Sequence, residues 1–215
     1  DSYYNSCSKD STITVNKKAP TITFSPTSKT VTYGDKTVYK VSVTSTIPTG
    51  TSISWASNNS SVAKITAGST TSEVSIQPQN AGTARVTPTV TNSNYSFTIS
   101  SQYHTLTVNK ANATIYAPAN INAYIGSYFS INTSTTPSGQ YEIYSYYNAG
   151  YVLLPSSGTN ASNQYYHAIG GPGECYFTAP NTINTFTIKF KSYLNSSNYN
   201  ETGFVTTNVT IIKYN

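Results

Sequence analysis

The two cysteines are the side chains with the most obvious chemistry in this 215-residue chain. Neither Cys7 nor Cys175 has a second cysteine near it, and the two histidines, His104 and His167, lie at no metal-ligand spacing. The sequence therefore predicts no metal site. In an extracellular β protein, two isolated cysteines favour a single disulfide, Cys7–Cys175. A pair of reduced, buried thiols is the alternative, and the sequence leaves open whether the disulfide would join two chains or stay within one.

No pattern in the sequence predicts an enzyme. A nucleophilic hydrolase needs a base beside its nucleophile, but neither histidine belongs to a Gly-x-Ser-x-Gly turn. Glu142, Glu174 and Glu201 are too isolated in sequence to argue for the acid pair of a glycosidase. The loop Gly170–Gly173 lacks the Lys and Ser/Thr of a phosphate-binding loop. We expect neither catalysis nor a cofactor.

Asn-x-Ser/Thr sequons would carry N-linked glycans if the chain is exported. The number of sequons is close to what chance gives in a chain with 22 Asn, 31 Ser and 35 Thr, so the number alone is not evidence of glycosylation. Six of them (Asn58, Asn59, Asn94, Asn160, Asn195 and Asn200) fall in segments that we expect to be loops. The nine sequon asparagines are Asn58, Asn59, Asn94, Asn112, Asn132, Asn160, Asn195, Asn200 and Asn208.

The charge pattern argues against nucleic acid as a partner. The net charge of +5 arises because only seven acids face 12 Lys and Arg residues. The bases are scattered, and the sole adjacent pair is Lys17-Lys18, whereas a nucleic-acid binder gathers them on one face. No apolar run approaches the ~20 residues of a membrane span. We expect a lightly charged surface, no membrane span and an extracellular location.

A short segment, Thr12–Lys17, recurs as Thr105–Lys110. Over eleven-residue windows that start at Thr12 and Thr105, seven positions are identical. The second copy follows strand-like sequence and closes a domain, whereas the eleven residues before the first copy are too few for one. We interpret Thr12–Lys17 as a last strand that lacks a domain of its own.

The side chains of this orphan strand would alternate between its two faces. In extended conformation Cys7, Ile13 and Val15 point to one side, and Thr12 and Thr14 to the other. The apolar face formed by Ile13 and Val15 suits insertion between the strands of another domain. These four residues, 12 to 15, are the predicted site residues of the donor strand, Thr12–Lys17.

Short strand patterns alternate with turn residues from residue 21 to residue 109, as in a β-sandwich. In Thr37–Thr44 the alternation predicts that Thr37, Tyr39, Val41 and Val43 face the core. Trp55 lies in the middle of a predicted strand, so we expect it to fill the core between two sheets.

This region resembles the bacterial immunoglobulin-like group 2 domain. The resemblance lies in Ile53–Asn59 (Ile-Ser-Trp-Ala-Ser-Asn-Asn), Val62–Ile65 (Val-Ala-Lys-Ile) and Ala81–Val86 (Ala-Gly-Thr-Ala-Arg-Val). The family combines a Trp and a Ser/Asn turn with a Ser-Val-Ala-x-Val strand and a later Ala-Gly-Thr-Ala-x-Ile. The resemblance covers about residues 20–109. It implies an immunoglobulin-like sandwich that serves as a spacer or adhesive module on a cell surface, without catalytic residues.

The second half of the chain has a different composition, with 14 of the 20 Tyr residues after Lys110. Strands are predicted at Tyr151–Leu154 and at Thr185–Phe190, among others. Sparse Ala and Leu and abundant β-branched residues argue against helices. We expect an all-β chain with two immunoglobulin-like β-sandwich domains in tandem. The predicted parts are a donor strand and linker (1–18), a first sandwich (19–109) and a Tyr-rich second sandwich (110–215).

Three functions fit these observations. The first is a subunit of an extracellular cell-surface filament, or pilus, in which the donor strand of one subunit completes an identical neighbour; composition and layout resemble the glycosylated thread filaments of archaea. The second is a spacer fragment of a modular adhesin, with residues 1–18 ending a preceding domain. The third is a carbohydrate-binding module that uses stacked tyrosines. The tyrosines in question are Tyr144, Tyr146, Tyr147, Tyr165 and Tyr166.

One prediction stands against the first function. Asn208–Lys213 has the pattern of the second domain's own last strand, so the groove that would receive a donor strand is not visible in the sequence. A donor strand folded back onto its own first domain is the intramolecular alternative.

Overall fold

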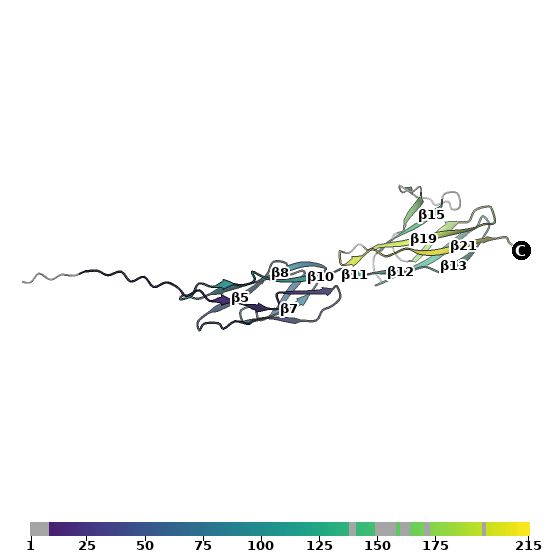
Figure 1. Cartoon of the computed structure of the whole chain (residues 1–215). Helices are drawn as coiled ribbons and strands as arrows, with labels where there is room; N and C mark the ends of the chain where they lie inside the picture. The colour runs from purple at the N-terminus through teal and green to yellow at the C-terminus, as the bar shows by residue number, and fades with distance from the viewer. Residues whose placement is uncertain (1–8, 138–140, 149–157, 160–163, 170–172, 195–196) are drawn as a thin grey trace, which may run out of the picture. The chain divides into compact units, whose positions relative to one another are not determined.

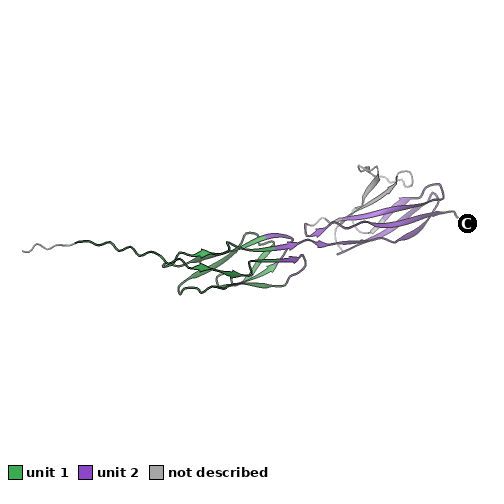
Figure 2. Cartoon of the chain, viewed as in Figure 1, with its two compact units in different colours: residues 1–29, 37–77, 84–106 green, residues 30–36, 78–83, 107–215 purple. Residues whose placement is uncertain are grey.

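A computed structural model of the chain describes residues 9–137, 141–148, 158–159, 164–169, 173–194 and 197–215. No helix occurs among these residues, and the regular elements are strands. The prediction of an all-β fold is therefore confirmed. The chain divides into two compact units (Figure 2). Unit 1 comprises residues 1–29, 37–77 and 84–106, and unit 2 comprises residues 30–36, 78–83 and 107–215.

The first sandwich has two four-stranded sheets, several of whose strands are labelled in Figure 1. One sheet has the order β2-β4-β7-β6, made of Phe24–Ser25, Tyr39–Val43, Glu73–Pro78 and Ala63–Ala67. The other has the order β3-β10-β8-β5, made of Ser28–Thr32, His104–Asn109, Gly82–Thr91 and Ser52–Ser57. Lettered along the chain, these are an A-B-E-D sheet and a G-F-C sheet with an added A′ strand. That strand order makes the sandwich immunoglobulin-like.

The core of the first sandwich follows the alternation of its strands. Val41, in the middle of β4, is fully buried, and Trp55 on β5 is 4% exposed. The indole of Trp55 meets the ring of Phe24 edge to face, with centroids 5.7 Å apart. Its Nε1–H donates to the carbonyl oxygen of Thr71 at 2.9 Å, which satisfies the buried donor. The predicted core role of Trp55 is confirmed, and its place on the C strand is typical of immunoglobulin domains.

The second sandwich has the same arrangement with a different number of strands. Its first sheet is β12-β14-β18, made of Thr114–Tyr116, Tyr128–Thr136 and Gly173–Thr178. Its second sheet is β13-β21-β19-β15-β17-β16, made of Asn120–Tyr124, Val205–Ile212, Thr185–Leu194, Tyr141–Asn148, Gln164–Ile169 and Gly158–Thr159. These correspond to an A-B-E sheet and an A′-G-F-C sheet with two more strands beyond C, the side on which variable-type domains are extended.

Period-two alternation also builds the second core. Phe186, Ile188 and Phe190 on β19 are 6%, 0% and 0% exposed, as their spacing predicts. The predicted last strand, Asn208–Lys213, belongs to β21 up to Ile212, and β21 lies between β13 and β19. The predicted strand Tyr151–Leu154 lies outside the described residues.

Two short parallel pairs complete the described strands. β1 (Thr21–Ile22) pairs with β9 (Thr98–Ile99) beside the first sandwich. β11 (Ala111–Asn112) pairs with β20 (Tyr199–Asn200) in unit 2.

Candidate functional site

The segment of residues 9–17 is extended and belongs to no strand of the described chain; Figure 1 shows it leading away from the first sandwich. Ile13 is 83% exposed and Val15 is 86% exposed. Their counterparts in the sequence repeat, Leu106 and Val108 on β10, are 0% and 2% exposed. The same short sequence is therefore a buried core strand in β10 and solvent-exposed in the N-terminal segment.

The chain joins the first sandwich at Lys18. Lys18 forms a parallel bridge with Tyr95, and its carbonyl oxygen accepts a hydrogen bond from the N–H of Ser96 at 2.9 Å. Two residues later, the carbonyl oxygen of Pro20 accepts from the N–H of Thr98 at 3.1 Å. These bonds fix the main chain from Lys18 onward and leave the predicted donor strand outside.

The E strands of the two sandwiches differ in their neighbours. In the first sandwich, β7 lies between β4 and β6. In the second, β18 ends its sheet among the described strands and has β14 as its neighbour. An edge strand presents main-chain N–H and C=O groups along one side, to which another chain can add as a further strand. β18 carries no Pro, and Glu174 is its one charged residue, so it has few of the features that block such pairing.

Cys175 lies on β18 with its side chain in the core. It is 2% exposed, next to Phe177 on the same face, and its Sγ is 3.7 Å from Oγ1 of Thr133. Burial raises the pKa of the Cys175 thiol to about 11, although the contact with Thr133 acts in the opposite direction. A thiol with that pKa is a poor nucleophile at neutral pH. Cys7 lies outside the described residues, so the Cys7–Cys175 disulfide stays a prediction.

His104 is a structural residue of the first core. It is fully buried at the start of β10, and its two ring nitrogens lie 2.8 Å from the carbonyl oxygen of Pro26 and from the hydroxyl of Tyr39. Because a carbonyl oxygen only accepts, Nδ1 carries the proton and Nε2 accepts from the tyrosine. Burial lowers the pKa of His104, and the bond to Pro26 partly offsets it. Burial also raises the pKa of the Tyr39 hydroxyl. Both ring nitrogens are occupied by these bonds, so His104 is a packing residue of this core.

Two carboxylates, those of Glu73 and Glu201, form ion pairs. Glu73 lies 2.6 Å from Nζ of Lys40, and Glu201 lies 2.6 Å from Nζ of Lys191. The hydrogen bond from Lys40 lowers the pKa of Glu73. Within the described ranges, no group of three or more His, Cys, Asp or Glu residues is placed to hold a metal ion. The same residues contain no helix long and apolar enough to cross a membrane.

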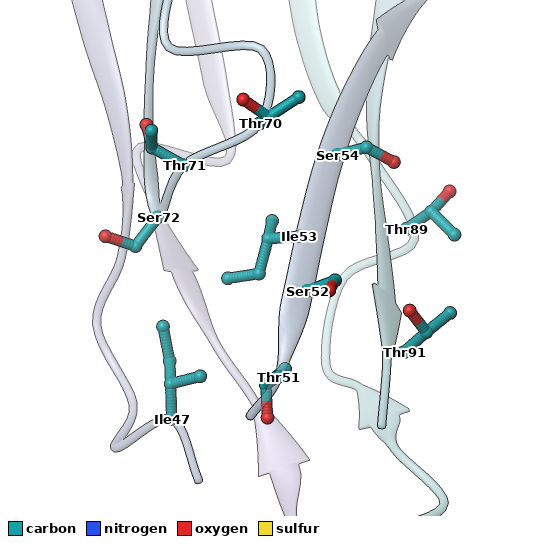
Figure 3. A pocket seen from close by; sticks show the side chains of 10 residues that line it. All are labelled: Ile47, Thr51, Ser52, Ile53, Ser54, Thr70, Thr71, Ser72, Thr89 and Thr91. Atoms are coloured by element: carbon teal, nitrogen blue, oxygen red, sulfur yellow. The ribbon is translucent and has the colours of Figure 1, made fainter. Parts of the chain in front are cut away.

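A pocket of about 610 Å³ in the first sandwich is lined by residues of β5 and β8 and of the loop at 70–72 (Figure 3). Ile47 and Ile53 supply its apolar surface, and the other eight lining residues are Ser or Thr. These hydroxyls can hydrogen-bond a ligand, but the lining contains no acid, base or cysteine. It therefore provides no catalytic group.

The sequons divide by exposure. Among the described residues, those with exposed asparagines are Asn58, Asn94, Asn112, Asn132, Asn200 and Asn208, whereas Asn59 is half-buried. Asn160 and Asn195 lie outside the described residues. Asn200, expected in a loop, belongs to β20, and its Nδ2 donates to Oδ1 of Asn112 at 2.9 Å. A glycosylated amide nitrogen keeps one hydrogen, so this bond is compatible with a glycan on Asn200.

No protein-family model and no curated protein sequence matches the chain. Among solved structures, the adhesin InvE of Yersinia pseudotuberculosis is similar over 88% of this chain, at 17% identity and a TM-score of 0.32. This chain spans 58% of the length of that structure. The two immunoglobulin domains of DIP-gamma are similar over 91% of this chain and 99% of their own, at 8% identity and a TM-score of 0.31. The tandem immunoglobulin repeats of Dlar are similar over 90% and 98%, at 13% identity and a TM-score of 0.28.

The predicted site residues thus lie in different places. Ile13 and Val15 are exposed on the N-terminal segment, Thr12 and Thr14 alternate with them, and Cys175 is buried in the second sandwich. The tyrosines 144, 146, 147, 165 and 166 lie on β15 and β17, and their side chains are outside the described part of the structure. No local sequence pattern indicates that β18 ends its sheet among the described strands. Two strands of the other sheet, β16 and β17, precede β18 where a D strand would stand, and no local pattern assigns them to that sheet.

Proposed function

We propose that the chain is a subunit of an extracellular filament in which the Thr12–Lys17 strand of one subunit adds to the second sandwich of the next. One observation carries this proposal: Ile13 and Val15 are almost fully exposed, although the same sequence forms a buried strand at Leu106 and Val108. A strand with an apolar face and no described partner within its own chain needs a partner elsewhere. An identical subunit supplies one without a second gene product.

The energy available from this pairing is substantial. Burying an exposed Ile or Val side chain contributes ~1.5–3 kcal/mol, so Ile13 and Val15 together provide a few kcal/mol. Main-chain hydrogen bonds along the added strand contribute further, at about 0.5–1.5 kcal/mol each. Part of this gain offsets the entropy lost when the extended segment becomes ordered.

The edge of β18 is the acceptor that the strand order favours. The N-terminal segment repeats β10, a G strand, but the G position of the second sandwich is filled by β21. A donor strand could enter the G position only by displacing β21, so another position must accept it. The D position, which β6 fills beside β7 in the first sandwich, has no counterpart among the described strands beside β18. The donor strand would take this position, with Ile13 and Val15 facing the core.

The same proposal assigns the rest of the chain. Residues 1–18 are the donor strand and linker, and 19–109 and 110–215 are two structural sandwiches with an adhesive or cell-contact role and no enzymatic one. The resemblance of the first sandwich to bacterial immunoglobulin-like group 2 domains, and of the whole chain to archaeal thread filaments, agrees with a place at the cell surface. The exposed sequons would carry N-linked glycans there, on a secreted glycoprotein.

Two matched double substitutions test the proposal. Ile13→Asp with Val15→Asp places two charges on the apolar face, and burying them would cost several kcal/mol. Thr12→Asp with Thr14→Asp adds the same charges to the opposite face of the same strand. We expect the first variant to remain monomeric and the second to form filaments, measured by sedimentation and negative-stain microscopy. Both should unfold like the unaltered chain, because these side chains are exposed in the monomer.

Filaments formed by the Ile13/Val15 variant, or an unaltered protein that stays monomeric at all concentrations, would refute the proposal.

A second candidate function follows from the same repeat. Because Thr12–Lys17 repeats the last strand of the first sandwich, it is also what the last strand of a further sandwich would look like in a modular adhesin. A synthetic peptide of residues 9–18 separates the two. The filament model requires it to bind a chain truncated before Lys18, whereas a spacer module has no site for it.

A further inference from the structure

The donor strand is tied to its own first sandwich by a very short tether. Val15 would lie inside the neighbouring subunit, and Lys18 is already fixed to the loop at Tyr95 and Ser96. From Val15 to Lys18 the extended chain spans at most ~11 Å. Lys18 can therefore lie little farther from the inserted Val15 than the ~10 Å that separates the two sheets of one sandwich. The first sandwich must therefore begin almost where the acceptor ends.

The surface around Lys18 is a braced loop, residues 91–97. Nδ2 of Asn92 donates to the carbonyl oxygen of Thr49 at 3.2 Å and to Oγ1 of Thr51 at 3.1 Å. Oδ1 of Asn92 accepts from the N–H of Asn94 at 2.9 Å. One side chain thus ties this loop to the neighbouring loop and fixes its own turn.

Aromatic packing orders the other end of the same loop internally. The rings of Tyr95 and Phe97 are stacked, with centroids 6.1 Å apart and planes inclined by 23°, and the N–H of Ser96 between them donates to the carbonyl oxygen of Lys18 at 2.9 Å. A loop ordered in this way presents a preformed surface, and contacts made by such a surface lose little entropy on binding.

We infer that this loop forms a second contact between subunits, a joint in which residues 91–97 of one copy abut the acceptor sandwich of the next. The inference rests on the proposed strand addition, because the ~11 Å tether brings the loop to the acceptor only when Val15 is inserted. The joint turns a flexible connection into a stiff one, since each subunit is then held at two places. It also gives the Asn94 sequon a particular position. Asn94 is exposed on this loop, so a glycan on it would lie in the joint, against the neighbouring copy.

Lengthening the tether tests the joint without altering the donor strand. A (Gly-Ser)₃ insertion between Lys17 and Lys18 adds up to ~20 Å of flexible chain. The same insertion between Lys9 and Asp10 is the matched control, because it lies on the other side of the donor strand. We expect the control to give filaments like those of the unaltered chain. The tether variant should give filaments with a several-fold shorter persistence length in micrographs, which dissociate at lower urea concentration.

A tether variant that fails to assemble while the control assembles would also support the joint, because strand addition alone would then be too weak. Filaments of the tether variant that are as stiff and as stable as the control would overturn it. Loss of assembly only in the Ile13/Val15 variant, with the tether variant unaffected, would leave strand addition standing and the joint refuted. An unaltered chain that never assembles refutes both.

Discussion

Acidification should destabilise the first sandwich through one histidine. His104 is fully buried and neutral, held by Pro26 and Tyr39 at 2.8 Å each, and burial lowers its pKa. In the unfolded chain its pKa returns to ~6.5. Below that pH the unfolded state binds a proton that the folded state excludes, so the free energy of unfolding falls as pH falls. The slope reaches at most ~1.4 kcal/mol per pH unit and levels off once the folded-state pKa is passed.

Urea unfolding followed by the fluorescence of Trp55, the single tryptophan and a residue of the same core, measures this effect at pH 7.5 and 5.5. Replacing His104→Gln keeps a donor and an acceptor but removes the titration. We expect that variant to be less stable at pH 7.5 by about 1–3 kcal/mol. The amide has a donor and an acceptor on one carbon, so it cannot reach Pro26 and Tyr39 together as the two ring nitrogens do. Its stability should then change less between the two pH values. The chain's other histidine provides the control: His167→Gln should keep the unaltered pH dependence. An unchanged slope in the His104 variant would show that other groups cause the acid sensitivity.

Two further predictions concern covalent chemistry. Native filaments run on non-reducing gels should give a ladder that collapses to monomer with reductant, if Cys7 of one subunit is bonded to Cys175 of the next; a single monomer band under both conditions excludes that bond. Native material should have an intact mass well above the 23.2 kDa of the bare chain, with glycans on exposed sequons such as Asn94 and Asn132 and none on residues 12–17. A native mass equal to that of the bare chain would contradict export through a glycosylating pathway.

Features that depend on local alternation were predictable from sequence. The inward residues of β19 and the core position of Trp55 follow from period two, because a strand between core and solvent must alternate. The apolar face of the exposed N-terminal segment was predictable for another reason. A repeat of a core strand at Ile13 and Val15 indicates an apolar face whatever lies beside it. These predictions needed only neighbours in the sequence.

Features that depend on sheet membership were not predictable. The A strand of the first sandwich is divided at Pro26. Its first part, β2, joins one sheet, and its second part, β3, joins the other. β3 is almost entirely exposed and shows no alternation, so its pattern does not reveal which sheet it joins. β13, Asn120–Tyr124, is short and contains two Asn residues, which are depleted in strands, so its sequence did not predict a strand although Ile121 and Ala123 alternate with the Asn residues. The assignment of β17 to the C side of the second sandwich, rather than to the sheet that β18 ends among the described strands, depends on long-range pairing with β15.

The register of the donor strand along β18 determines whether Cys7 can reach Cys175. Cys7 and Ile13 are six residues apart, or ~20 Å along an extended strand, while β18 is only six residues long. A disulfide requires Cα atoms ~4.4–6.8 Å apart. If Cys7 pairs with Cys175, which lies opposite Ile131 on β14, Ile13 is beyond the ends of both β18 and the nine-residue β14, so other strands of the sandwich must bury it. If instead Ile13 and Val15 lie beside Cys175 and Phe177, Cys7 lies beyond the opposite end and no bond to Cys175 forms. The gel ladder thus decides the register of the donor strand as well as the presence of the bond.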